Sequence, residues 1–375
     1  MSHLSITVVI PTHNRASLVG RAVASALTAT DPDDEVIVVD DGSTDDTEAA
    51  LAVFGSRIRY IQTRNRGAGA ARNRGVAEAR NPLVALLDSD DEFMPDKLQL
   101  QRTVMEARPD VVFCGSDFAL RYDSGGVRRR HLAHWHGDAR GWEAILGRGV
   151  PYSAFGPCPE GRDDFLVHIG DLYPTMARCN YVATFTVLVR VAAAGEARFA
   201  PEHLAFHEDW AWFARLSRLG PVAHLDCETA WNWGHDGPRM THTADLLKMA
   251  ARLQVLHETW GSDEAFLTRH GRFFRRLVSQ EHVNHGRQLS ADGRTREARE
   301  EFARAGDALL NPQLLASRAL ALLPGPVARL VIGLGRRALQ HAFLALVVLP
   351  QDALQPDGPG LDLGALWDVT VAAMG

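Results

Sequence analysis

Short apolar runs alternate with amphipathic segments through the first third of the chain. One amphipathic segment spaces Val19, Val23, Ala26 and Leu27 at the 3.6-residue period of a helix. Another helix is expected after Thr44, which can cap its first turn. This repeated alternation predicts an α/β fold with a mostly parallel, twisted sheet and helices on both faces. The predicted strands are 6–10 (ITVVI), 35–39 (EVIVV), 58–61 (IRYI) and 83–87 (LVALL).

The alternation stops near residue 116, and two regions of different composition follow. Residues 116–238 are richer in aromatic residues and turns, which suits loops that shape the site of a second substrate. From about residue 240 the pattern is almost wholly helical. We therefore divide the chain into residues 1–115, 116–238 and 239–375, the last being a helical C-terminal region.

Residues 326–350 contain two apolar runs separated by Gly335-Arg336-Arg337. This pattern favours a last core element of the C-terminal region. Two alternatives are open, a homodimer contact and an amphipathic helix lying on a membrane surface.

Four acidic residues follow the predicted strand at 83–87: Asp88, Asp90, Asp91 and Glu92. In a parallel sheet they would lie at the carboxyl end of their strand, where open α/β sheets bind ligands. Clustered carboxylates repel one another unless a positive charge joins them. The Asp-x-Asp spacing suits Mg or Mn, held by one or two carboxylates and the phosphates of a substrate. The alternative is a solvated acidic turn that stabilises the start of the next helix.

The glycine-rich stretch at 65–75 (NRGAGAARNRG) matches neither common nucleotide motif. Arg72 stands where a dinucleotide fingerprint needs its third glycine, and no Gly-Lys-Ser/Thr sequence follows. A glycine-rich helix start with Arg72 and Asn73 nearby can still direct backbone N–H groups and a guanidinium to a phosphate. A close-packed helix start without a ligand is the other interpretation.

Composition and charge narrow the classes of partner. The net charge of −6 and the pI near 6.2 argue against nucleic acid, because its binders usually carry a net basic face. The four cysteines are far apart and form no Cys-x-x-Cys pair, which is typical of a reduced, cytoplasmic protein. No signal-peptide pattern and no uncharged apolar run of about 18 residues is present. We expect a cytoplasmic protein, with peripheral membrane association as the alternative.

Five motifs, taken together and in their order, resemble the family 2 glycosyltransferases of the GT-A fold. The resemblance covers residues 1 to about 235 and implies a Rossmann-like GT-A domain, a nucleoside-diphosphate sugar donor, a divalent cation (Mn or Mg) and an acceptor. Residues 1–115 would be the nucleotide-sugar-binding half, and residues 116–238 the half with the acceptor site and the catalytic base. The motifs are VVIPTHNR (8–15), VVDDGSTDDT (38–47), NRGAGAARNRG (65–75), LLDSDD (86–91) and HEDWAWFARL (207–216).

The resemblance implies a set of residues that contact the nucleotide sugar. Asp41 is the first candidate for the base, Arg72 and Asn73 would lie near the diphosphate, and Asp88 would face the ribose. The whole set is Pro11, Thr12, Asn14, Arg15, Asp40, Asp41, Arg72, Asn73, Asp88 and Ser89.

The resemblance also implies metal ligands and catalytic acids. Asp90 would ligate the cation. His235 is the second candidate ligand, because WNWGHDG (231–237) lies where many members have an Arg-x-His segment, although Trp233 replaces the arginine. Glu208 and Asp209 match the acidic pair of the family, and Asp209 would be the general base of an inverting transfer. A carboxylate at a helix N-terminus is favoured in its ionised form and can accept a proton.

Three rival functions are weighed against this one. An aspartyl phosphohydrolase shares the Asp-x-Asp spacing but needs a lysine at the phosphoryl site, and Lys97 falls in a predicted helix. A nucleotidyltransferase fits the fold, but PTHNR (11–15) follows the first strand instead of a glycine-rich basic loop. A non-catalytic sugar-nucleotide-binding protein would keep the fold, and the full set of carboxylates favours an enzyme over it.

Overall fold

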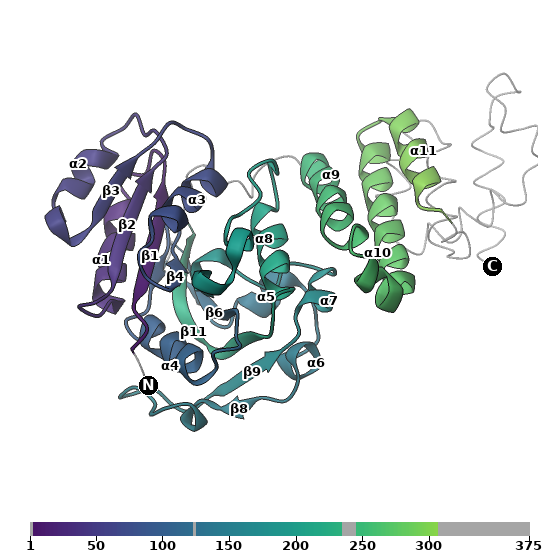
Figure 1. Cartoon of the computed structure of the whole chain (residues 1–375). Coiled ribbons are helices and arrows are strands. Elements are labelled where there is room, and N and C mark those ends of the chain that lie inside the picture. Colours follow the sequence, from purple (N-terminus) through teal and green to yellow (C-terminus); the bar gives the residue numbers. More distant parts are fainter. Residues whose placement is uncertain (1–2, 123–124, 235–244, 307–375) are drawn as a thin grey trace, which may run out of the picture. The chain divides into compact units, whose positions relative to one another are not determined.

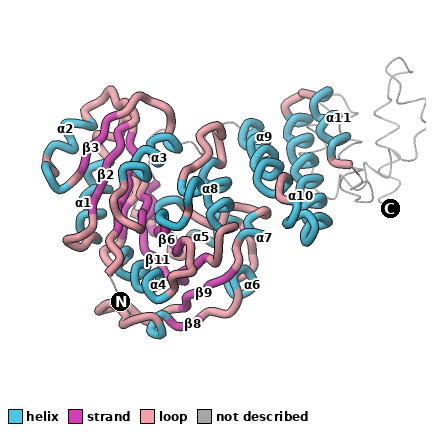
Figure 2. Tube along the Cα trace, in the orientation of Figure 1, coloured by secondary structure: helices cyan, strands magenta, loops and turns pink. Residues whose placement is uncertain are grey.

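The computed structural model describes residues 3–122, 125–234 and 245–306. The chain divides into two compact units, Met1–Thr241 and His242–Gly375 (Figure 1). The described strands all lie in the first unit, whereas the described part of the second unit is helical (Figure 2). The first unit therefore holds both of the regions that the sequence separates at residue 115.

One 11-stranded sheet runs through the first unit, in the order β3-β2-β1-β4-β10-β6-β11-β9-β8, with β5 on β11 and β7 on β6. The strands are β1 Ile6–Thr12, β2 Glu35–Asp40, β3 Arg59–Gln62, β4 Leu83–Leu86, β5 Glu92–Phe93, β6 Phe113–Tyr122, β7 Val127–Arg128, β8 Val150–Pro151, β9 Leu166–Gly170, β10 Leu188–Arg190 and β11 Val222–Gly234.

Helices connect these strands and continue into the second unit. The α-helices are α1 Val19–Ala29, α2 Thr47–Ala52, α3 Ala68–Glu78, α4 Lys97–Ala107, α5 Leu132–His136, α6 Trp142–Leu146, α7 Tyr173–Met176, α8 Glu208–Ser217, α9 Asp245–Leu256, α10 Glu264–Ala291 and α11 Thr295–Arg304. Short 3-10 turns are η1 Gly55–Arg57, η2 Tyr152–Ala154, η3 Thr184–Thr186, η4 Val191–Ala193 and η5 Gly195–Arg198, and η7 His257–Gly261 is a π-helix.

Strand direction differs between the two halves of the sheet. The neighbours β3, β2, β1 and β4 are all parallel, as the alternating pattern predicts. Beyond them β10 is antiparallel to both β4 and β6, β11 is parallel to β6, and β9 and β8 are antiparallel again. The predicted fold class is confirmed, and apart from the two-residue β5, which pairs antiparallel with β11, the antiparallel strands belong to the region without the strand–helix alternation.

Alternating side chains of β2 pack on opposite faces of the sheet. Val36 and Val38 belong to the large core that includes residues of α1 and α4, whereas Ile37 and Val39 pack with Ala71 of α3. Because side chains of a strand alternate between faces, a strand that is apolar at both sets of positions needs a helix on each side. This explains the unbroken apolar runs that mark these strands in the sequence.

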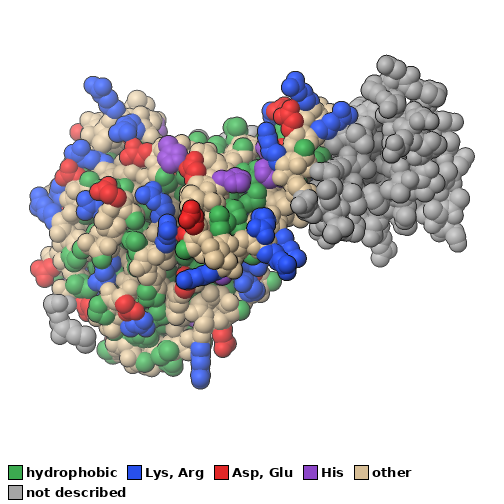
Figure 3. Space-filling model, turned by 45° about the vertical axis from the view of Figure 1, so that its right-hand side comes forward, with side chains coloured by type: hydrophobic (Ala, Val, Ile, Leu, Met, Phe, Trp, Pro, Cys, Tyr) green, Lys and Arg blue, Asp and Glu red, His purple; other side chains and the backbone are tan. Residues whose placement is uncertain are grey.

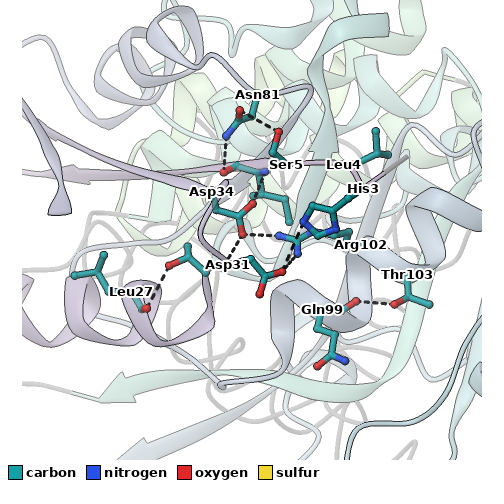
Figure 4. Close-up of polar contacts among 12 residues, drawn as sticks. His3, Leu4, Ser5, Leu27, Asp31, Asp34, Asn81, Gln99, Arg102 and Thr103 are labelled. Carbon is teal, nitrogen blue, oxygen red and sulfur yellow. Dashed lines mark hydrogen bonds and ion pairs between the residues drawn. The ribbon is translucent and has the colours of Figure 1, made fainter. Parts of the chain in front are cut away.

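A polar cluster fastens the amino end of β1 (Figure 4). The backbone N–H of Ile6 donates to Asp34, at 2.7 Å, and its carbonyl accepts from the Asn81 amide at 2.9 Å. Arg102 of α4 pairs with Asp31 and Asp34 in the turn before β2. Since this cluster lies at the amino ends of the strands, it supports the sheet from the side opposite the acidic motif.

The second unit packs α10 against α9 and α11. Asp263 caps α10 by accepting a hydrogen bond from the backbone N–H of Phe266 at 3.0 Å. His282 of α10 lies 2.7 Å from the Glu301 carboxylate of α11. A helical C-terminal region is thus present over residues 245–306, while the apolar runs at 326–350 lie outside the described residues.

The visible surface carries charged side chains of both signs mixed with apolar ones (Figure 3). Within the described ranges, the helices are too short or too polar to cross a membrane.

Candidate active site

The carboxyl ends of three parallel strands bring the predicted motifs together. Thr12 at the end of β1 pairs in register with Asp40 of β2, and β4 runs parallel on the other side of β1. The loops that follow these strands carry the motifs expected to bind nucleotide and metal. The acids after β4 therefore lie beside the ends of β1 and β2, as the parallel-sheet prediction required.

Asp40 and Asp41 are buried and hydrogen-bonded to nearby loops. The Asp40 carboxylate accepts from the Tyr60 hydroxyl and from the backbone N–H of Ser43, both at 2.7 Å. The Asp41 carboxylate accepts from the backbone N–H groups of Arg66 at 3.0 Å and Gly67 at 2.7 Å. Asp41 thereby fixes the start of α3 against β2, and its contact with a base stays a prediction.

The loop after β1 is held by Asn14. This residue adopts a left-handed backbone (φ 52°), and its side-chain oxygen accepts from the backbone N–H of Thr44 at 2.8 Å. The prediction that Thr44 caps a helix is wrong, because Thr44 is bound to Asn14 and α2 begins only at Thr47. Arg15 reaches the acidic loop, with its guanidinium 3.9 Å from the Asp90 carboxylate.

Pro11 and Thr12 are buried at the end of β1. The Thr12 hydroxyl has no hydrogen-bond partner in the part of the chain that the structure describes. The backbone carbonyl of Thr12 accepts from the N–H of Asp41 at 2.8 Å. These two residues therefore lie, buried, where the loops after β1 and β2 begin.

Arg72 joins the two halves of the candidate site. Its guanidinium lies 2.9 Å from the Asp88 carboxylate and 3.2 Å from the Glu208 carboxylate, and its side chain is only 10% exposed. Burial raises the pKa of Asp88, and the Arg72 charge opposes that rise. Arg72 therefore links the acidic loop after β4 to the first turn of α8.

Asn73, next to Arg72, forms its hydrogen bonds with the loop before α8. Its amide donates to the Ala200 carbonyl at 2.9 Å and to Glu202 at 3.0 Å, and its oxygen accepts from the N–H of Ala200 at 2.7 Å. Asn73 thus fastens α3 to the loop before α8. Its predicted contact with a diphosphate stays a prediction.

Within the acidic motif, Asp91 has a structural role. It is buried and accepts from the Asn232 amide at 2.9 Å and from the backbone N–H of Trp233 at 3.1 Å. Burial, together with the charges of Asp90 and Asp88, raises the pKa of Asp91 well above its ordinary value. Ser89 is also buried. Asp90, in contrast, is partly exposed beside them.

The residues that could hold a cation are few. In the described ranges, no group of three His, Cys, Asp or Glu side chains is arranged to bind a metal by itself. Asp88 and Asp90 lie close enough for their charges to interact, and the guanidinium groups of Arg72 and Arg15 lie 2.9 Å from Asp88 and 3.9 Å from Asp90. A cation bound here would need oxygen ligands from a substrate, as Mg commonly does. His235 lies outside the described residues.

Trp233 is part of an arginine–tryptophan stack that was not predicted from the sequence. The guanidinium of Arg21 lies 4.0 Å from the centre of the Trp233 ring, and that of Arg121 lies 4.9 Å from it. Arg21 also donates to the backbone carbonyl of Asp90 at 3.2 Å. An arginine on α1 therefore contacts both the acidic loop and Trp233. The one sequence signal was the Trp-x-Trp spacing at 231–233, which puts both rings on one face of β11.

Glu208 and Asp209 begin α8, after His207 in a left-handed conformation (φ 61°). Burial, and then the neighbouring Glu208 charge, raises the pKa of Asp209 to about 7. Asp209 accepts from the Asn180 amide at 3.0 Å, whereas Glu208 is paired with Arg72. Asn180 was not identified from the sequence. A carboxyl group that titrates near neutrality can take up a proton from a bound hydroxyl.

Comparison with known proteins agrees with this geometry. Residues 7–162 match the family described as glycosyl transferase family 2. An uncharacterized glycosyltransferase of Rickettsia conorii is 39% identical over 108 residues, 28% of this chain and 18% of that protein. Succinoglycan biosynthesis protein ExoO of Rhizobium meliloti is 45% identical over 96 residues, 25% of this chain and 28% of that protein. The chain thus corresponds to less than a third of the length of either relative.

The fold also resembles a solved structure. TarS 1–349 of S. aureus, crystallised in complex with UDP-GlcNAc, aligns with 96% of this chain and all of that chain at a TM-score of 0.56. The two sequences are 14% identical, so the likeness concerns the fold. The resemblance drawn from the sequence motifs is confirmed over residues 7–162, which include four of the five motifs; the motif at 207–216 lies outside the match.

Proposed function

We propose that the chain, whose residues 7–162 match the family described as glycosyl transferase family 2, is a glycosyltransferase that uses a nucleoside-diphosphate sugar. The observation that carries the proposal is Arg72, whose guanidinium contacts Asp88 of the donor half and Glu208 of the acceptor half. The contact puts the expected leaving-group site beside the expected base. In the reaction, an acceptor oxygen bonds to the anomeric carbon while the bond from that carbon to the diphosphate breaks.

Two observations support a nucleotide-sugar donor. The edge formed by Thr12, Asp40 and Asp41 lies outside the carboxyl ends of parallel strands, where α/β folds bind nucleotides. The TarS structures of the same fold contain UDP-GlcNAc and UDP. We place the base and ribose near Asp41 and Asp88, and the diphosphate near Arg72 and the acidic loop.

A divalent cation, Mn or Mg, fits the charge of this loop. Asp88, Asp90, Glu208 and Asp209 lie in one electrostatic neighbourhood whose closest compensating charge is Arg72. Such an excess of carboxylates favours a bound cation. We propose that Asp90 would hold it, because Asp90 is the second acid of the Asp-x-Asp spacing and is partly exposed. A cation there would stabilise the negative charge that develops on the departing diphosphate.

Asp209 is the proposed general base. Glu208 is tied to Arg72, while Asp209 has a pKa near neutrality. Asp209 would take the proton of the acceptor hydroxyl as the new bond forms. A single base is consistent with the one-step transfer with inversion that we propose.

The test is a panel of sugar nucleotides differing in base and sugar, mixed with the full chain in the presence of Mn, Mg or chelator. Release of nucleoside diphosphate with at least one donor is expected, as hydrolysis when no acceptor is added and faster with a suitable acceptor. Binding of sugar nucleotides without turnover under all conditions would identify a non-catalytic binding protein instead. Conversion of a sugar nucleotide and added pyrophosphate to nucleoside triphosphate and sugar 1-phosphate would identify a nucleotidyltransferase.

A further inference from the structure

Asn180 lies in the segment between α7 and η3, and its side chain contacts the proposed base. The amide nitrogen donates to Oδ2 of Asp209 at 3.0 Å. The amide oxygen accepts from the backbone N–H of Val182 at 3.0 Å. Because the oxygen is taken by an N–H donor, the nitrogen is the end of the amide that faces Asp209.

The segment that carries Asn180 is fastened at both sides. Before it, the Trp210 indole of α8 donates to the Met176 carbonyl at 2.8 Å. After it, the buried Tyr181 donates its hydroxyl to Asp138 at 2.5 Å and accepts from Arg140 at 3.1 Å. These contacts hold Asn180 against the first turn of α8, so its amide presents a fixed donor to Asp209.

Charged groups around Asp209 act in opposite directions. Burial, Glu208 and Asp88 favour the protonated acid, while Arg72 and the backbone N–H of Trp210 favour the carboxylate. A hydrogen bond donated by a neutral amide also favours the carboxylate. It further fixes the rotation of the carboxyl group, since the Trp210 N–H binds Oδ1 at 2.8 Å and Asn180 binds Oδ2.

We propose that Asn180 is a positioning residue for glycosyl transfer, whose amide keeps the Asp209 carboxylate ionised and turned toward the acceptor hydroxyl. This role rests on the proposed function, because it acts through the base. Asn180 itself takes no proton and makes no bond to the sugar. A residue with this role changes the rate and its pH dependence, and it leaves donor affinity nearly unchanged.

The test compares Asn180→Ala and Asn180→Asp with wild type in transfer assays at saturating donor from pH 5 to pH 9. Removing a hydrogen bond to a charged group should lower kcat on the order of tenfold to a hundredfold in Asn180→Ala. In Asn180→Asp, two facing carboxylates share one proton, so the acidic limb of the pH–rate profile should move upward by more than about one pH unit. The KM for donor should change little in both variants.

Asn81→Ala is the matched control. Asn81 also uses its amide to fasten a loop, at the amino end of β1, and it lies away from the site. In this variant the acidic limb of the pH–rate profile should lie at the same pH as in wild type, even if the variant unfolds at a lower temperature. The position of the limb does not depend on how much of a preparation is folded, so partial misfolding does not imitate the expected shift.

Outcomes separate the two proposals. If wild type transfers the sugar and both Asn180 variants keep the wild-type kcat and the wild-type acidic limb of the pH–rate profile, the role of Asn180 is overturned. The enzyme assignment is then unaffected. If wild type transfers the sugar and Asp209→Asn transfers it equally fast, the assignment of Asp209 as the base is overturned, and the role of Asn180 is overturned with it. If wild type consumes no sugar nucleotide, the proposed function itself fails, and with it the role of Asn180.

Discussion

At the scale of single residues, we propose different tasks for neighbouring acids. Asp91 is bound to Asn232 and Trp233, whereas the partly exposed Asp90 is the proposed cation ligand. Glu208 is paired with Arg72, whereas Asp209, whose pKa is raised to about 7, is the proposed base. Substitutions of the two members of a pair should therefore have different effects.

Asp209→Asn should bind donor almost normally and lose transfer by about a hundredfold to ten-thousandfold, the usual cost of removing a general base. Glu208→Gln should lose less, because consecutive helix residues point about 100° apart and cannot both face one hydroxyl. Transfer rate at saturating donor and donor affinity, measured on the same preparations, check this. If Glu208→Gln is inactive while Asp209→Asn remains active, Glu208 is the base and the assignment is reversed.

In wild type, the transfer rate should rise with pH through about 7, because the pKa of Asp209 is raised to about 7 and only the ionised form accepts a proton.

Asp90→Ala should abolish the Mn-dependent part of nucleoside-diphosphate binding, because it removes the proposed metal ligand. Asp88→Ala should weaken binding less, since Asp88 is proposed to face the ribose. Calorimetric titration with and without Mn distinguishes the two effects. Wild type and Asp90→Ala with equal, metal-independent affinity would exclude a cation at Asp90.

At the scale of elements, α3 is the part on which the site depends most. It carries Arg72 toward the acids and Asn73 toward the loop before α8. Its start is bound by Asp41, and its glycine Gly75 packs directly on β1. A Cβ added at Gly75 would lie 2.2 Å from a methyl carbon of Val9. The close seating of α3 therefore fixes where the Arg72 guanidinium lies.

Gly75→Ala should destabilise the protein by about 1–3 kcal/mol, the usual cost of overpacking, and should weaken donor binding by displacing Arg72. Gly20→Ala on α1 is the control, since a Cβ there meets nothing within 4 Å. Alanine favours a helix over glycine, so Gly20→Ala should be neutral or slightly stabilising. Denaturant unfolding and nucleotide titration of both variants provide the measurement. Equal stability of the two variants would show that α3 can shift without cost.

At the scale of the whole first unit, one sheet joins the two halves, and its far strands contain buried histidines. His224 of β11 is buried, stacks on Trp142 at 3.6 Å and has no partner for Nε2 among residues that the structure describes. Burial, followed by the charges of His168, Arg130 and His136, lowers its pKa well below the ordinary value. The folded unit therefore holds this ring neutral where an unfolded chain would protonate it.

The neutral His224 ring should contribute less to stability as the pH drops below about 6.5, the pKa of an unperturbed histidine. Below that value the unfolded chain binds a proton on His224 that the folded unit does not bind, so this residue favours unfolding by up to about 1.4 kcal/mol per pH unit. Above it, the contribution is fully present. The raised pKa values of Asp91 and Asp209 act in the opposite direction, because the folded unit binds protons there that the unfolded chain does not bind. Denaturant unfolding at pH 7.5 and 5.5 should therefore show wild type losing more stability, or gaining less, than His224→Phe, which keeps a ring on Trp142. An identical change in the two proteins would contradict the role of His224.

The sequence by itself determined the N-terminal strand–helix alternation, the parallel arrangement of the four strands β1, β2, β3 and β4, and the edge of the sheet at which the motifs after these strands meet. These features follow from local patterns, because a strand buried on both faces must be apolar at consecutive positions and parallel strands share one carboxyl edge. The loops after those strands could be located for the same reason.

Tertiary structure alone decided which side chains at that edge contact one another. The contact between Arg72 and Glu208 joins residues 136 positions apart, that between Asn73 and Ala200 joins residues 127 apart, and that between Asn180 and Asp209 joins residues 29 apart. Neither period nor motif spacing encodes such pairs. They arise only when the chain has packed and buried polar groups have found their partners.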